Sequence, residues 1–83
     1  MQIERIQTGV RLEKRLVKVL KAVAELRDLS LGELIEAIAL HALEGRTPFA
    51  PETLAKIDEL KRVYGLDLTA ADSHTLSETE ERR

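Results

Sequence analysis

The sequence has no cysteine and no tryptophan among its 83 residues, and only one tyrosine and one phenylalanine. Without cysteine, a disulfide framework and a zinc site built on cysteine pairs are both excluded. The two histidines, His41 and His74, lie far apart and do not form a metal site by themselves. Because so short a chain buries little apolar surface, it usually needs a disulfide, a metal or a partner. We therefore expect self-association, with no metal and no cofactor.

Long apolar runs are also missing. The longest, from Ala37 to Ala42, is interrupted by His41 and is too short to cross a membrane. Residues 1–15 carry charges throughout and lack the apolar stretch of a signal peptide. These features predict a soluble, cytoplasmic protein without a membrane partner.

The chain offers no recognisable catalytic arrangement. No motif places a nucleophile, a general base and an oxyanion-stabilising group together. Asp58 and Glu59 are adjacent, so on a helix their carboxylates point apart and do not make an acid–base pair. His41 lies in an apolar segment, which favours a packed or interface histidine over a ligand. We expect that the protein is not an enzyme.

The charges are unevenly distributed along a chain whose net charge is only −2. Residues 1–27 hold seven basic and three acidic residues, a net of +4, whereas residues 28–83 hold six basic and twelve acidic residues, a net of −6. Such asymmetry indicates a polyanionic partner for the basic part. Ordinary charged helical surfaces explain it equally well, so charge alone leaves both interpretations open.

Residues 5–12 show the alternation that is typical of a strand with one buried face. The inner positions are Ile6, Thr8, Val10 and Leu12, and the outer positions between them are Gln7, Gly9 and Arg11. The rest of the chain has helical patterns, so a strand here finds no partner within the chain for its backbone hydrogen bonds. We expect this segment either to be frayed or to pair with its copy in a second chain.

Apolar residues then recur at helical spacing in two segments. The first runs from Glu13 to about Arg27, and its stripe consists of Leu16, Val19, Leu20, Val23 and Leu26. The second begins at a capping box formed by Ser30 and Glu33 and ends near Gly45. It is apolar over more than half of its circumference, which one neighbouring helix cannot cover. This is a second indication of a partner chain.

A third helix is predicted after a connector at residues 46–50. Pro51 suits its first turn, and Gly65 is a stop signal. The polar and charged residues 73–83 are expected to be disordered. The predicted organisation is a core domain at residues 1–45, a connector and third helix at residues 46–72, and a tail at residues 73–83.

A strand, a helix and a capped second helix, all within residues 5–44, resemble the ribbon-helix-helix family, the class of the Arc and methionine repressors. The resemblance implies a mostly α-helical, intertwined homodimer, in which one short strand from each chain forms a two-stranded ribbon and two helices from each chain close the core. An additional C-terminal helix and a flexible tail would follow. The implied dimer core consists of Ile6, Thr8, Val10, Leu12, Leu16, Leu20, Val23, Leu34, Ile35 and Ile38.

In this family the exposed side of the ribbon enters the DNA major groove, where alternate side chains reach base edges. The resemblance implies base contacts from Gln7, Gly9 and Arg11. It also implies phosphate contacts from Lys14 and Arg15 and, at the N-terminus of the second helix, from Ser30, Leu31 and Gly32.

Two functions follow from these observations. The first is a dimeric DNA-binding protein, either a transcriptional repressor or an antitoxin-type regulator. The second is a dimeric protein-interaction module without specific DNA binding, in which residues 46–83 hold a protein partner. The second is favoured by Gly9, which offers no side chain to a base, and by Asp28, which places a carboxylate where the family usually has glycine.

Overall fold

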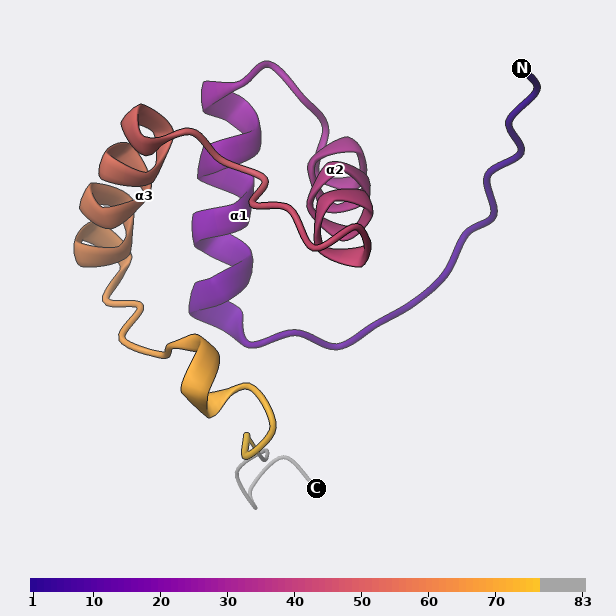
Figure 1. Cartoon of the computed structure of the whole chain (residues 1–83). Helices are drawn as coiled ribbons and strands as arrows, with labels where there is room; N and C mark the ends of the chain where they lie inside the picture. Colours follow the sequence, from indigo (N-terminus) through magenta and orange to yellow (C-terminus); the bar gives the residue numbers. More distant parts are fainter. Residues whose placement is uncertain (77–83) are drawn as a thin grey trace.

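The computed structural model describes residues 1–76, and its regular elements are all helical. Three α-helices, α1 (Lys14–Leu26), α2 (Leu31–Leu43) and α3 (Pro51–Tyr64), are followed by one turn of 3-10 helix, η1 (Ala70–Asp72). Of the pairs of helices in this part of the chain, only α1–α2 and α1–α3 are packed together. α1 therefore stands between the other two (Figure 1).

The predicted N-terminal strand is wrong, and with it the ribbon-helix-helix fold. Residues 1–12 form an extended arm without regular secondary structure, here called the N-terminal arm, and no strand occurs anywhere within residues 1–76. A strand exists only when its backbone groups bond to a second strand, and the regular elements within residues 1–76 are all helices. Alternation alone therefore gives an extended conformation and not a sheet.

The core of the chain is small. Val19, Val23 and Ala24 of α1 and Leu34 of α2 are its only buried residues within the described part. Half-buried side chains surround them, namely Leu20, Leu29, Ile38, Phe49, Ile57, Leu60 and Leu66. Because these side chains come from all three helices and the segments after them, α1 organises the whole fold.

The tail prediction lies largely outside the described residues. Only residues 73–76 of the predicted tail are described, and they continue from η1 through a turn. In this turn the N–H of Thr75 donates to the carbonyl of Asp72 at 3.0 Å. Leu76 follows with about half of its surface exposed.

All three α-helices end with the same backbone motif. One residue turns into the left-handed region, and the next N–H bonds back to a carbonyl in the last turn of the helix. The left-handed residues are Asp28 (φ 58°), Gly45 (φ 72°) and Gly65 (φ 69°). The closing bonds run from Leu29 N to Ala24 O (2.9 Å), from Arg46 N to His41 O (2.9 Å) and from Leu66 N to Lys61 O (2.8 Å). Only the motif after α1 places a residue with a side chain in this conformation.

Asp28→Gly is expected to raise the free energy of unfolding by about 0.5 kcal/mol, because glycine adopts a positive φ without the steric cost that a Cβ brings. Urea unfolding at fixed protein concentration measures the change. Gly45→Ala is the matched control at the equivalent position of α2 and is expected to lower stability by about 1 kcal/mol. A destabilised Asp28→Gly variant would contradict this account of the turn.

Candidate nucleic-acid interface

The N-terminal arm carries the three residues for which base contacts are predicted. Gln7, Gly9 and Arg11 all lie on it and are exposed. In Figure 1 the arm leaves the start of α1 and runs away from α3, past α2. An extended and exposed segment of this kind presents both its side chains and its backbone to a partner.

An ion pair joins the N-terminal arm to α2. The guanidinium of Arg5 binds the carboxylate of Glu36 on α2 with two hydrogen bonds, from Nε to Oε2 at 2.9 Å and from Nη2 to Oε1 at 3.0 Å. This hydrogen bonding lowers the pKa of Glu36 and raises the pKa of Arg5. Both side chains are about half exposed or more, so water screens the pair and it holds the arm only weakly.

Three lysines share one exposed face of α1. Lys14, Lys18 and Lys21 follow one another at spacings of four and three residues, which places them along one side of the helix. None of the three forms an ion pair within residues 1–76. Together with Arg11 on the arm, they form a basic surface that begins at the N-terminus of α1.

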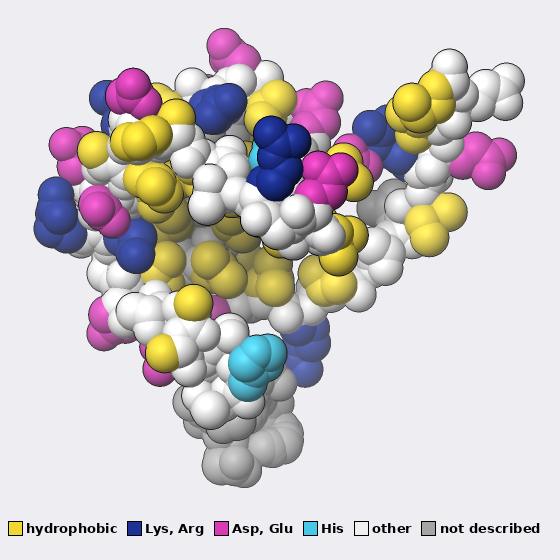
Figure 2. Space-filling view, in the orientation of Figure 1, with side chains coloured by type: hydrophobic (Ala, Val, Ile, Leu, Met, Phe, Trp, Pro, Cys, Tyr) yellow, Lys and Arg dark blue, Asp and Glu magenta, His cyan; other side chains and the backbone are white. Residues whose placement is uncertain are grey.

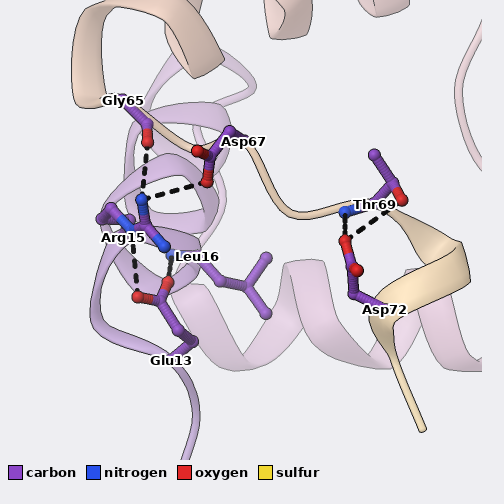
Figure 3. Close-up of polar contacts among 7 residues, drawn as sticks. All are labelled: Glu13, Arg15, Leu16, Gly65, Asp67, Thr69 and Asp72. Atoms are coloured by element: carbon purple, nitrogen blue, oxygen red, sulfur yellow. Dashed lines mark hydrogen bonds and ion pairs between the residues drawn. The ribbon is translucent and has the colours of Figure 1, made fainter. Parts of the chain in front are cut away.

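Arg15 does not belong to this basic surface, although a phosphate contact is predicted for it. Its Nε donates to Glu13 Oε2 at 3.0 Å, and its Nη1 donates to the carbonyl of Gly65 at 2.9 Å and to Asp67 Oδ1 at 3.1 Å (Figure 3). The hydrogen bond to Glu13 is the main cause of its raised pKa. The structure thus uses this guanidinium to join the start of α1 to the segment after α3, and we call these contacts the Arg15 clamp.

Glu13 is the N-cap residue of α1. Its Oε1 accepts a hydrogen bond from the backbone N–H of Leu16 at 3.0 Å, while its Oε2 accepts from Arg15 (Figure 3). The bond from Leu16 is the main reason that the pKa of Glu13 is lowered, and the contact with Arg15 adds to it. A carboxylate at this end of a helix is also favoured by the helix dipole.

The N-terminus of α2 holds the remaining predicted phosphate contacts. Ser30 Oγ accepts from the N–H of Glu33 at 3.1 Å, and Glu33 Oε1 accepts from the N–H of Ser30 at 2.9 Å, which confirms the predicted capping box. The N–H groups of Leu31 and Gly32 lie in the same first turn. Glu33 therefore places a negative charge where a phosphate is predicted to bind, which opposes an anion there.

The predicted phosphate contacts lie at the two ends of α1. Lys14 is at its start, whereas Ser30 to Gly32 follow its end, and a helix of this length separates them by about 20 Å. The arm runs between these two places, because Arg5 binds Glu36 on α2, and the charge of Glu33 in the first turn of α2 helps to raise the pKa of Arg5. Gln7, Gly9 and Arg11 lie along the chain between Arg5 and Lys14.

The predicted dimer core divides into two sets. Val23 and Leu34 are buried in the chain's own core, and Leu16, Leu20 and Ile38 are half-buried around it. The others are exposed, namely Ile6, Thr8, Val10, Leu12 and Ile35. Further exposed apolar residues lie on α2, where Leu40 is 65% and Leu43 is 84% exposed. The single chain thus leaves half of the predicted dimer core uncovered.

Sequence reasoning missed the Arg15 clamp and the pairing of Arg5 with Glu36. The only local signal was Glu13 directly before the helical pattern, because a carboxylate there can accept a backbone N–H. The partners Asp67 and Glu36 are distant in sequence from the arginines they bind. No spacing rule connects such residues, so only the fold reveals the contacts.

Comparisons with protein-family profiles, with curated proteins and with solved structures find no significant match to this chain.

Within residues 1–76, no helix has the length and apolar character that a membrane span requires. The same residues contain no group of three or more metal-binding side chains. His41 Nδ1 lies 2.7 Å from the carbonyl of Ala37 on its own helix.

Acid is expected to weaken the fold partly through Glu13. Because its pKa in the folded chain lies below the ordinary value of 4.5, its contribution is fully present above that value and is lost as the pH falls through the folded pKa. Glu13→Gln removes this titration, so the variant should lose less stability than the wild type between about pH 5 and pH 3. Urea unfolding at both pH values measures this.

Glu59→Gln is the control, since Glu59 is exposed on α3 and makes none of the clamp contacts. This variant should lose as much stability on acidification as the wild type. Equal losses in Glu13→Gln and wild type would show that Glu13 does not contribute.

Proposed function

We propose that the protein is a dimeric DNA-binding regulator, a repressor or an antitoxin-type protein, whose N-terminal arm and α1 contact the DNA. The observation that carries the proposal is the basic surface formed by Arg11, Lys14, Lys18 and Lys21. It lies in the part of the chain with a net charge of +4, while the remainder has a net charge of −6. A duplex attracts the first part and repels the second, so this polarity orients the protein on DNA.

Self-association is supported by the apolar surface that one chain leaves exposed. Only four residues are buried within residues 1–76, while Ile6, Val10, Leu40 and Leu43 are each more than 60% exposed. Large apolar side chains exposed on both the arm and α2 favour an interface with a second chain. In the proposed dimer, two arms and two basic faces of α1 are available to one duplex.

The proposed contacts divide by chemistry. Lys14, Lys18 and Lys21 supply phosphate contacts, which give affinity without sequence preference. Gln7 and Arg11 supply the contacts to bases, since an amide pairs with adenine and a guanidinium with guanine. Arg15 is not among the proposed phosphate contacts, because the carboxylates of Glu13 and Asp67 already bind its guanidinium.

The lysine face is tested by the salt dependence of binding to a DNA fragment, measured by fluorescence anisotropy. Replacing Lys14, Lys18 and Lys21 with glutamine should flatten the slope of log K against log salt by about 0.9 for each lysine that contacts a phosphate. The control replaces Arg46, Lys56 and Arg62, three exposed residues outside this surface, with glutamine. Its slope should match that of the wild type; equal slopes in both triple variants and wild type would refute the proposed face.

Base recognition is tested on a sequence selected from random DNA by the purified protein. Arg11→Ala should weaken binding to the selected sequence by about tenfold or more, as expected when a bidentate contact to a base is lost. Binding to unrelated DNA should weaken much less. If the two affinities fall by the same factor, Arg11 contacts only the backbone.

A protein-interaction module remains the second candidate, and the carboxylates of Asp28 and Glu33 beside the start of α2 favour it. The prediction that residues 46–83 hold this partner receives little support from α3. Ile57 and Leu60 of this helix already pack against the core of the chain. The absence of any DNA binding in the salt titration, together with a stable dimer, would favour this candidate.

A further inference from the structure

An apolar groove runs along α1 on the side that faces α3. One wall consists of Leu16, Leu20 and Val23 of α1, and the other is formed by residues after α2, chiefly Ile57, Leu68 and Leu76. The groove has a volume of about 360 Å³. Figure 2 shows it as a hollow lined by hydrophobic side chains in the middle of the molecule. Its second wall lies outside residues 5–44, the part of the chain that carries the family resemblance.

The Arg15 clamp sets the position of the second wall. Gly65 and Asp67, which Arg15 binds, alternate with Leu66 and Leu68, which line the groove. Thr69 and Asp72 close the next turn, with the N–H of Thr69 donating to Asp72 Oδ2 at 2.8 Å. The wall is therefore held by polar contacts on its outer side while its apolar side faces the groove.

The arm of the same chain does not enter this groove. No residue before Glu13 lines it, and the Arg5–Glu36 pair holds the arm beside α2. The arm nevertheless carries the side chains that an apolar groove would take, because Ile6 is 86% and Val10 is 71% exposed. Within residues 1–76, the arm therefore leaves the groove open and exposes its own apolar side chains away from it.

We infer that the groove of one copy receives the N-terminal arm of a second copy, with Ile6 and Val10 of the arm facing the groove. The two arms are exchanged about a two-fold axis, so both grooves are filled and the assembly closes as a dimer. At about 3.3 Å per residue the arm reaches about 40 Å from the start of α1, enough to extend beyond its own chain onto a second copy. The Arg5–Glu36 pair is about half exposed, so it opposes this exchange only weakly.

The exchange deepens the proposed function, since it rests on the self-association proposed above but not on DNA binding. Side chains of an extended segment alternate in direction. When Ile6 and Val10 face the groove, Gln7 and Arg11 face outward. Seating the arm therefore presents the residues proposed to contact bases.

The test measures self-association without DNA, by sedimentation equilibrium of the full chain. Val10→Glu places a charge on the arm, and Leu68→Lys places one on the groove wall, where Leu68 is half-buried and lies outside the core. Each variant alone should raise the dimer dissociation constant by about tenfold or more. Val63→Glu is the control, since Val63 is 74% exposed on α3 and does not line the groove.

Mixing the two variants gives the decisive result. In the mixed dimer one arm–groove contact is wild type, and the other joins the new glutamate to the new lysine, whereas each variant alone has two mismatched contacts. An equimolar mixture should therefore dimerise at least tenfold more tightly than either variant. Recovery in the mixture also shows that both variants are folded.

The inference is overturned if the wild-type chain is monomeric, if both variants dimerise as tightly as the wild type, or if the mixture shows no recovery. Leu43→Glu changes the exposed face of α2. If this variant weakens the dimer and the groove variants do not, the copies join through α2 and the inference is wrong. Because DNA is absent, these outcomes are separate from those of the salt titration. A dimer that exchanges arms but does not bind DNA would overturn the proposed function alone.

The lack of cysteine in the chain allows a direct check by disulfide formation. Val10→Cys chains and Leu68→Cys chains of different tagged mass should form a mixed disulfide on oxidation. Val10→Cys mixed with Val63→Cys should not, because Val63 lies outside the groove. Equal cross-linking in both mixtures would contradict the inferred seating of the arm.

Discussion

The packing of α1 against its two neighbours is the interaction on which the rest of the structure depends. α2 and α3 are both held by α1, and three of the four buried side chains, Val19, Val23 and Ala24, belong to it. So small a core opposes the conformational entropy of the chain with little buried apolar area. Many apolar side chains are left exposed, and the proposed self-association rests on them.

Polar contacts compensate for part of this shortage by fixing segments that the core does not reach. The Arg15 clamp joins the first turn of α1 to the residues after α3, and the Ser30–Glu33 box holds the first turn of α2. Both lie at the surface, where each hydrogen bond contributes modestly. The value of the clamp is geometric, because it sets where the wall of the groove formed by Leu66 and Leu68 lies relative to α1.

The surfaces proposed to contact DNA lie apart from the core. Lys14, Lys18 and Lys21 lie on the side of α1 opposite the buried Val19 and Val23, and the arm begins at the N-terminus of the same helix. The proposal of a long, uniformly charged partner rests on this combination of one helix face and one extended segment. In that proposal, the acidic remainder of the chain repels such a partner from the other sides of the molecule.

The sequence by itself determined the three helices, the capping box and the turns that end the helices, because these depend on contacts within a few residues. It also placed the apolar stripe of α1 and the basic charge beside it. Only the tertiary structure decided that residues 1–12 form an arm and not a strand, since a strand depends on a partner that local alternation does not supply. The tertiary structure also drew Arg15 away from the basic face, because Asp67 and Gly65 are brought to it by the packing of α3 on α1 and by no feature of the sequence around it.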